Sequence, residues 1–387
     1  MKVLTVLTYY RPHTSGLTIY VERLATSLVK LGHEVTVLTS QYSPDLPREE
    51  FKDGVRIIRA PILFRISKGV IMPTFGILAW KLAFQHDVIH LHLPQFDAAG
   101  VALRGRILRK PTIITYHCDL QLPTGLFNRF VNFVVHRMNN LAGSLAHRIA
   151  AYTEDFASHS PFLSRFAEKV EVILPPVQIP ETSQEKTAAF RADANPEEKT
   201  PVIGMATRFA SEKGVEILLN ALPRILKTYP EAMVLYAGQY LDVMGEQSYY
   251  QRLLPRIQQY QNEGRWKFLG ILESEEMAPF YANLDVLLVP SLNSTETFGL
   301  VQIEAMMQGT PTVASNLPGV RVPPTLTGMG LVVPIGDSKA LAEAILQIVS
   351  EPESYQGDLP EIKKTFDPLT NAGAYLEIYS ELLEEFN

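Results

Sequence analysis

Residues 285–315 read DVLLVPSLNSTETFGLVQIEAMMQGTPTVAS, and this stretch decides the fold. The apolar run at 285–291 and the run PTVAS at 311–315 each have the length and composition of a buried strand. The polar loop between them leads into a helical pattern that ends at Gly309, and glycine commonly follows a helix. A strand, a helix and another strand in this order predict one crossover unit of a parallel α/β sheet.

The same alternation extends through the rest of the chain. Further strands are predicted at 2–10, 33–40, 55–61, 87–94, 111–117, 148–154, 169–176, 202–208, 232–238, 266–272 and 331–334. A helical pattern at 19–31 follows the first strand, and helical patterns separate the later ones. The segment 175–200 is rich in Pro, Thr, Glu and Ala, which predicts a linker with a polar surface segment. We therefore predict two doubly wound, Rossmann-like α/β domains, over 1–178 and 179–365, that face each other across a cleft.

Composition narrows the class of protein. The chain has 387 residues, 46% hydrophobic and 20% charged, as is typical of soluble globular proteins with about two domains. The apolar run at 69–80 is too short to span a bilayer, and the first residues resemble a strand more than a signal peptide. A single cysteine, Cys118, excludes an intrachain disulfide and fits a cytoplasmic location.

Charge is distributed unevenly between the two halves. Residues 1–180 contain 20 basic and 13 acidic side chains, whereas the remainder contains 15 basic and 28 acidic ones. The basic residues are scattered and no nucleic-acid motif accompanies them, which disfavours nucleic acid as a partner. The stretches 59–81 and 122–138 mix aromatic side chains with cations. They predict either peripheral contact with an anionic membrane at its inner face or core helices whose cations reach out to solvent.

Unusual polar residues stand at the predicted strand ends, where open α/β sheets bind ligands. In the first loop, Gly16 precedes a helix and lets backbone N–H groups approach a phosphate, although a plain turn is the alternative. The loop lacks G-x-G-x-x-G, which disfavours a nicotinamide cofactor. In the second half, Arg208 and Lys213 flank a turn and suit a diphosphate. The alternative is a solvated charged turn, an interpretation that suits Glu212 best.

The stretch with which we began offers groups of two kinds. The backbone N–H groups of Phe298, Gly299 and Leu300 are predicted helix-start donors, which suit phosphate oxygens. The carboxylates of Glu296 and Glu304 cannot bind phosphate, so we assign them to sugar or ribose hydroxyls.

Histidines end or follow the strands of the first half. His117 follows a predicted buried strand and is either a site residue or a hydrogen-bonded loop residue. His90 and His92 point to the same face of one strand, a spacing that suits a metal or hydrogen-bonded support of the site. Because no third ligand is apparent, we predict no metal and no cofactor.

These residues together resemble a known family. TETFGLVQIEA is similar to the E-x-F-G-x-x-x-x-E motif of the family 4 retaining glycosyltransferases, which have the GT-B fold. The Gly16 loop, HLHLP, TYH, the Arg208 to Lys213 pattern and LYAG extend the resemblance over nearly the whole chain. It implies metal-independent transfer of a sugar, with retention, from a UDP- or GDP-sugar to a lipid-linked, glycolipid or polysaccharide acceptor. The departing phosphate would help to deprotonate the acceptor on the same face.

The resemblance also implies a role for each matching residue. Arg208 and Lys213 would neutralise the donor diphosphate, Glu304 would bind the ribose, and Glu296 and His117 would contact the donor sugar. The remaining donor-binding residues implied are Gly16, Gly238, Gly270, Ile271, Leu272, Phe298, Gly299 and Leu300. For the acceptor we predict Tyr10, His13 and Asp119. A last helix, 366–387, would return to the first domain.

The chain also departs from the family pattern, and other functions stay open. Ser15 stands where many members have glycine, Thr207 precedes the arginine, and the interdomain segment at 174–180 reads LPPVQIP. These departures concern loop closure rather than the reaction class. The alternatives are a GT-B-fold epimerase and a non-catalytic module that binds sugar nucleotides. A phosphorylase would need a pyridoxal lysine, which the sequence does not reveal.

Overall fold

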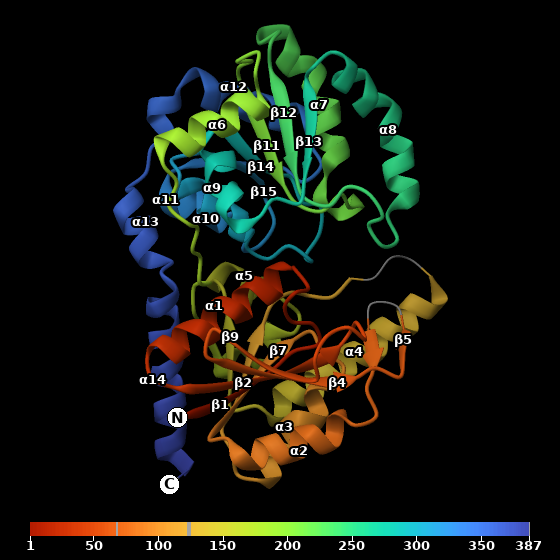
Figure 1. Cartoon of the computed structure of the whole chain (residues 1–387), viewed down its shortest axis with the longest axis vertical. Coiled ribbons are helices and arrows are strands. Elements are labelled where there is room, and N and C mark those ends of the chain that lie inside the picture. The colour runs from red at the N-terminus through yellow and green to blue at the C-terminus, as the bar shows by residue number, and fades with distance from the viewer. Residues whose placement is uncertain (67–68, 122–124, 387) are drawn as a thin grey trace. The chain divides into compact units, whose positions relative to one another are not determined.

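The computed structural model describes residues 1–66, 69–121 and 125–386, and the chain divides into two compact units (Figure 1). Unit 1 comprises Met1–Pro176 and Phe366–Asn387, and unit 2 comprises Val177–Thr365. The first boundary therefore lies two residues before the predicted one.

Unit 1 is built on an eight-stranded sheet with the order β10-β9-β8-β7-β1-β2-β4-β3. Every neighbouring pair is parallel except β3 with β4. Strand order changes direction at β1, so the crossover helices on its two sides cover opposite faces. Figure 1 shows α1 on one face and α2 and α3 on the other. The strands of unit 1 are β1 (Lys2–Val6), β2 (Glu34–Gln41), β3 (Glu49–Lys52), β4 (Val55–Pro61), β5 (Phe64–Ile66), β6 (Gly69–Ile71), β7 (Val88–Leu93), β8 (Thr112–Tyr116), β9 (Arg148–Ala151) and β10 (Val170–Val172).

The helices of unit 1 follow its strands in the chain. They are α1 (Gly16–Lys30), α2 (Phe75–Gln85), α3 (Ala98–Ile107), α4 (Leu126–Leu145), α5 (Glu154–His159), η1 (Leu163–Lys169) and α14 (Pro368–Phe386). Ser15 caps α1 by accepting a hydrogen bond from the Thr18 N–H at 3.2 Å. Helix α14 packs beside α1, and the Tyr375 hydroxyl shares a 2.8 Å hydrogen bond with Tyr20.

Unit 2 has a six-stranded parallel sheet with the order β13-β12-β11-β14-β15-β16. Its strands are β11 (Val202–Ala206), β12 (Met233–Ala237), β13 (Trp266–Gly270), β14 (Val286–Val289), β15 (Thr312–Ser315) and β16 (Gly330–Val333). Its helices are α6 (Gln184–Ala194), η2 (Ser211–Lys213), α7 (Val215–Thr228), α8 (Gln247–Asn262), α9 (Ser274–Ala282), α10 (Leu300–Met306), α11 (Val322–Thr327), α12 (Ser338–Ser350), η3 (Pro352–Tyr355) and α13 (Leu359–Thr365). The strand order reverses at β11, whose neighbour β14 comes three strands later in the chain.

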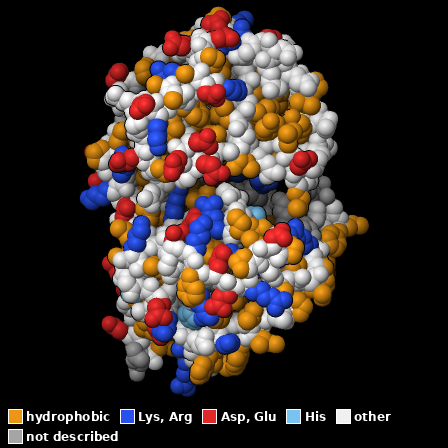
Figure 2. Space-filling model, viewed as in Figure 1, with side chains coloured by type: hydrophobic (Ala, Val, Ile, Leu, Met, Phe, Trp, Pro, Cys, Tyr) orange, Lys and Arg blue, Asp and Glu red, His pale blue; other side chains and the backbone are white. Residues whose placement is uncertain are grey.

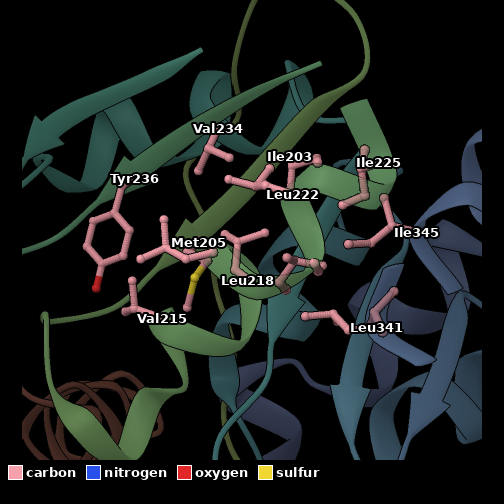
Figure 3. Close-up of a cluster of buried hydrophobic side chains, with 14 of the residues drawn as sticks. Ile203, Met205, Val215, Leu218, Leu222, Ile225, Val234, Tyr236, Leu341 and Ile345 are labelled. Carbon is pink, nitrogen blue, oxygen red and sulfur yellow. The ribbon is translucent and has the colours of Figure 1, made fainter. Parts of the chain in front are cut away.

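The core of unit 2 shows why these residues fold this way. The apolar stripe of α7, including Leu218 and Leu222, packs on β11 and on Leu341 of α12 (Figure 3). Such a stripe at helical spacing against continuously apolar strands is the arrangement that the sequence predicts.

The structure confirms the predicted doubly wound α/β class, with three local differences. The predicted strand at 2–10 ends at Val6. The hairpin of β5 and β6 and the edge strand β3 were not predicted. The expected linker at 175–200 contains α6. Ser183 caps the start of this helix by accepting a hydrogen bond from the Lys186 N–H. Ser-Gln-Glu is an ordinary helix-start signal, which the abundance of Pro and Thr around it obscured.

Among the described residues, no helix combines the length and the apolar character required to cross a lipid bilayer.

Candidate functional site

The turn after β11 carries the two predicted phosphate-binding cations of unit 2. Arg208 follows β11, and Lys213 ends η2. Gly214 then adopts φ 71°, and a Cβ at this position would lie 2.1 Å from the carbonyl oxygen of Pro290. Glycine is therefore required, because it lets this turn pack against the end of β14. The packing brings Lys213 next to the loop SLNSTETFG, which follows β14.

An ion pair joins the turn after β11 to the loop after β14. Lys213 Nζ lies 2.6 Å from Glu296 Oε2, and both side chains are partly buried. Nearby, the Leu292 N–H donates to the carbonyl oxygen of Glu212 at 2.9 Å. Residues that are 83 positions apart in sequence thus share one loop cluster at the carboxyl ends of β11 and β14. That is the edge at which open α/β sheets bind their ligands.

Arg208 also has a carboxylate partner. Its guanidinium contacts Glu212, which lies one turn away and is largely buried. Our interpretation of Glu212 as a solvated turn residue is therefore wrong. Each cation is held beside a carboxylate, so an anionic ligand would compete with Glu212 and Glu296 for them. Sequence reasoning missed this pair, because Arg208 lies in the loop before η2 and not on a helix with Glu212.

Glu304 lies on α10, where Tyr281 fixes its position. The Tyr281 hydroxyl donates to Glu304 Oε2 at 2.9 Å, and both side chains are buried. Helix α10 begins at Leu300, after Gly299 with φ 75°, while the Phe298 side chain enters the core. Sequence reasoning missed Tyr281, because nothing in α9 distinguishes this tyrosine from other core aromatics.

Among the remaining donor-side glycines, Gly238 has a packing role of its own. Gly238 has φ 126°, and a Cβ there would lie 2.1 Å from the carbonyl oxygen of Thr207. Its N–H donates to the carbonyl oxygen of Gly270 at 2.6 Å, which joins the ends of β12 and β13. Ile271 beyond this junction is exposed and Leu272 is partly buried. The predicted contacts of these residues with a base stay predictions.

In unit 1, His117 is enclosed by other ring systems. Its Nε2 lies 3.0 Å from Nδ1 of His92, and its Nδ1 shares a hydrogen bond with the Tyr152 hydroxyl. The Tyr20 ring meets the imidazole edge-on, with 5.0 Å between ring centroids. His117 is therefore both a strand-end residue and a hydrogen-bonded one, so the two interpretations of the sequence are not exclusive.

A second chain of hydrogen bonds ties this cluster to α14. His90 Nδ1 lies 2.7 Å from the Tyr379 hydroxyl, and its Nε2 lies 2.7 Å from Thr115 Oγ1. Thr115 Oγ1 in turn lies 2.6 Å from the Tyr375 hydroxyl. Of the two roles considered for His90 and His92, hydrogen-bonded support is the one that the geometry favours. The described residues include no group of three His, Cys, Asp or Glu side chains that could hold a metal ion.

Burial keeps this histidine cluster uncharged. Desolvation lowers the pKa of His90 and of His117 to about 3 and lowers the pKa of His92 well below its usual range. Neighbouring imidazoles lower the pKa of His92 and His117 further, because two adjacent cations would repel. The histidine cluster near β7 and β8 therefore offers uncharged hydrogen-bond donors and acceptors.

The predicted acceptor residues lie in the loops of unit 1. His13 stacks on Tyr9 with 4.9 Å between centroids, and burial lowers the His13 pKa. Tyr10 is almost completely buried. Asp119 accepts hydrogen bonds from the hydroxyls of Tyr116 and Ser160, both at 2.9 Å, and burial raises its pKa.

Gly16, the predicted phosphate-loop glycine, is the first residue of α1. A Cβ there would meet no atom within 4 Å, so the space beside this helix start is open. The glycine is not needed for packing within the chain, in contrast to Gly214 and Gly238.

Comparison with known proteins completes this description. Residues 15–176 match the family described as Glycosyl transferase 4-like domain, and residues 186–358 match Glycosyl transferases group 1. An uncharacterized glycosyltransferase of Methanocaldococcus jannaschii is 27% identical over 342 residues, covering 83% of this chain and 82% of that protein. A GDP-mannose-dependent alpha-mannosyltransferase of Mycolicibacterium smegmatis is 27% identical, covering 92% of this chain and 90% of that protein.

Solved structures agree on the fold. Anabaena HepE, solved with UDP-glucose, has a TM-score of 0.77 and 21% identity, covering 98% of this chain and 100% of its own. Sucrose-phosphate synthase from Thermosynechococcus elongatus has a TM-score of 0.77 and 23% identity, covering 99% of each chain. The chain therefore belongs to the family 4 glycosyltransferases and is a hexosyltransferase that uses a nucleotide sugar, with the GT-B fold.

Proposed function

We propose that the enzyme transfers a hexose, with retention and without a metal ion, from a UDP- or GDP-sugar to a lipid-linked, glycolipid or polysaccharide acceptor. The observation that carries the proposal is the 2.6 Å pair of Lys213 and Glu296, which joins a cationic turn to the loop before α10. A sugar nucleotide needs both kinds of group, because its diphosphate requires cations while its sugar hydroxyls are bound by carboxylates.

The chemistry follows from charge that develops on the leaving group. When the bond from the anomeric carbon to the diphosphate oxygen breaks, negative charge grows on the departing nucleoside diphosphate. The cations of Arg208 and Lys213 stabilise this charge as it develops, and for this reason we propose that no metal or other cofactor is required. The acceptor oxygen attacks from the same face, and the leaving phosphate takes up its proton.

The side chains around the cations hold the rest of the donor. Glu304, oriented by Tyr281, accepts hydrogen bonds from the ribose, and Glu296 does so from the transferred sugar. The backbone around Gly270 binds the base. His117 keeps its proposed contact with the sugar, with His92 and Tyr152 setting the orientation of its ring.

Names of relatives support a UDP or GDP donor without choosing between them. The mycobacterial relative is named for GDP-mannose, whereas Anabaena HepE was solved with UDP-glucose. We propose that the enzyme acts in the cytoplasm, where it meets a lipid-linked acceptor at the inner face of a membrane.

The direct test measures release of UDP or GDP from labelled UDP- and GDP-sugars, in the presence of a membrane extract that supplies acceptors. We expect turnover with a sugar of at least one nucleotide, and retention of configuration in the product. Absence of both turnover and binding with every donor would exclude transfer. Binding without turnover would favour a module that only binds sugar nucleotides.

A further inference from the structure

The helices α2, α3 and α4 of unit 1 contain basic residues and no acidic ones. Helix α3 packs between α2 and α4. All residues of these three helices are described, and none of them is Asp or Glu. Their basic residues are Lys81, Arg104, Arg106, Arg129 and Arg137. This absence of acids contrasts with the chain as a whole, in which acidic side chains outnumber basic ones.

Helix α4 exposes a row of aromatic side chains. Phe127, Phe130 and Phe133 recur every three residues on one face and are 59%, 65% and 56% exposed. On the opposite side, Asn139 is buried and its Oδ1 accepts from the Gln95 N–H at 3.3 Å. A surface helix normally buries its apolar face and exposes its polar one. The exposed phenylalanine row departs from this rule, which indicates that it meets something other than water.

The neighbouring helices extend the apolar surface. Ile77, Trp80 and Phe84 are exposed on α2, and Leu103 and Ile107 are exposed on α3. An open pocket of about 460 Å³ between α2 and α3 is lined by Pro73, Gly76, Ile77, Trp80, Lys81 and Arg104. Figure 2 shows hydrophobic side chains gathered along the margin of unit 1 where Figure 1 draws these helices. Scattered apolar side chains are ordinary on a surface, but this many on three neighbouring helices indicate an interaction site.

We propose that this three-helix face of α2, α3 and α4 docks on an anionic lipid bilayer. The aromatic and aliphatic side chains enter the boundary between headgroups and acyl chains, while the cations lie against lipid phosphates. The lysine and arginine beside the pocket, Lys81 and Arg104, meet a headgroup whose acyl chain contacts Ile77 and Trp80. A second copy of the chain is a poorer occupant, because two acid-free basic faces repel each other.

The inference deepens the membrane contact proposed above and names the residues that make it. Two stretches of sequence, 59–81 and 122–138, predicted part of this surface, although 67–68 and 122–124 lie outside the described residues. Helix α3 and the acid-free composition were not part of that prediction. Docking depends on unit 1 alone, so it is testable without sugar transfer.

The test measures binding of the full-length protein to vesicles of phosphatidylcholine, with and without phosphatidylglycerol, by co-sedimentation. Tryptophan fluorescence gives a second readout, because the chain has two tryptophans. Trp80 on the proposed face is 43% exposed, whereas Trp266 in unit 2 is 3% exposed. We expect at least tenfold tighter binding to the anionic vesicles, a blue shift of the emission, and weaker binding at high salt. Trp80→Phe should keep the binding and lose the shift.

Two variants and a matched control locate the surface. Phe130→Ser with Phe133→Ser should weaken vesicle binding about tenfold or more, since two aromatic side chains leave the interface. Arg129→Gln with Arg137→Gln should remove most of the preference for anionic lipid. Phe51→Ser is the control, because Phe51 is 72% exposed on β3, outside the proposed face, and its loss should change nothing.

The outcomes separate docking from catalysis. Circular dichroism should show that every variant is folded, and donor hydrolysis without an acceptor should be unchanged. Absence of vesicle binding by the wild type would overturn the proposal, even if the enzyme transfers sugar. Equal weakening by Phe51→Ser would overturn it too. A dimer that the phenylalanine variant dissociates, without any change in vesicle binding, would show instead that the face is a contact between copies.

Discussion

The histidine cluster of unit 1 and the loop cluster of unit 2 treat their polar groups in opposite ways. Unit 1 buries neutral imidazoles and phenols that share hydrogen bonds with one another, from Tyr379 to His90 and from His92 to His117. Unit 2 places ions in pairs at a loop edge, with Lys213 against Glu296 and Arg208 against Glu212. Hydrogen bonds within this cluster hold both ring nitrogens of His90 and of His117, so the cluster mainly fixes geometry. A charged ligand competes for the ions of unit 2, which therefore supply electrostatic binding energy.

The largest expected effect comes from removing charge in unit 2. Lys213→Ala should lower kcat/KM about 10²–10³-fold, since a cation that stabilises the leaving diphosphate is lost. Stability should change little, because ion pairs of this kind contribute about 1 kcal/mol or less. Nucleotide release and thermal unfolding measure the two quantities.

A matched control for this variant lies in the same unit. Arg252 of α8 forms an exposed ion pair with Glu216 at 2.9 Å and is not among the predicted donor-binding residues. Arg252→Ala should leave kcat/KM unchanged. A comparable loss of activity in both variants would mean that net charge, rather than the position of Lys213, is what matters.

Substitutions in the hydrogen-bonded cluster of unit 1 should lower stability, whereas substitutions in the loop cluster of unit 2 should lower activity. Tyr375→Ala removes a fully buried ring together with hydrogen bonds to Tyr20 and Thr115, and should cost about 3–5 kcal/mol of unfolding free energy. Tyr375→Phe keeps the ring and should cost about 1–3 kcal/mol, from the unsatisfied partners alone. Chemical denaturation measures both, and an unchanged free energy of unfolding in Tyr375→Phe would show that the hydroxyl network adds nothing.

Acid should destabilise unit 1 through its histidines. The pKa of His90 and of His117 is about 3 in the folded state, below the ordinary value, so the unfolded state takes up protons first. The contribution of the neutral imidazoles to the free energy of unfolding is fully present above about pH 6.5, and it is lost as the pH falls toward 3. The loss is up to about 1.4 kcal/mol per pH unit for each histidine.

The same titration sharpens the comparison between units. All nine histidines lie at or before residue 159, so unit 2 has none. Each unit contains one tryptophan, and Trp80→Phe leaves only the Trp266 signal of unit 2. Between pH 6 and 4 we expect Trp80 to report unfolding at lower denaturant concentration than Trp266 does. Identical shifts of both signals would contradict the assignment of the acid sensitivity to unit 1.

The smallest effect should come from the carboxylate beside Arg208. Glu212→Gln frees the guanidinium from competition and should lower the KM for the donor a few-fold, an effect limited by the partial exposure of the pair. Initial rates against donor concentration measure it. A raised KM would mean that Glu212 holds Arg208 in its binding geometry instead of competing for it.

Sequence reasoning predicted the strands better than it predicted which side chains form ion pairs. The strands β11, β12, β14 and β16 were predictable because each is a continuous apolar run, which is what a doubly covered parallel strand requires. The meeting of Lys213 with Glu296 was partly predictable, because both follow strands that end at one sheet edge. Their direct pairing and that of Arg208 with Glu212 depend on rotamers and on the Gly214 turn, which periodicity does not encode.

Buried polar networks were the least predictable part. Tyr281, Tyr152 and Tyr375 look like core aromatics in sequence, and only the fold places their hydroxyls beside Glu304, His117 and Thr115. Similarly, α4 has a clear helical pattern, but its pattern does not tell which face is buried. The exposure of its phenylalanine row emerges only from the packing of the opposite side, where Asn139, Ala142 and Gly143 are buried.

Titration calorimetry of UDP and GDP, against uridine and guanosine, tests the central claim most directly. The claim is that the paired cations of unit 2 bind the diphosphate of the donor. At least one nucleotide should bind the wild type, its nucleoside should bind at least tenfold more weakly, and Lys213→Ala should weaken nucleotide binding about tenfold or more. Binding of the nucleoside as tight as that of the nucleotide, or unchanged binding in Lys213→Ala, would contradict the account.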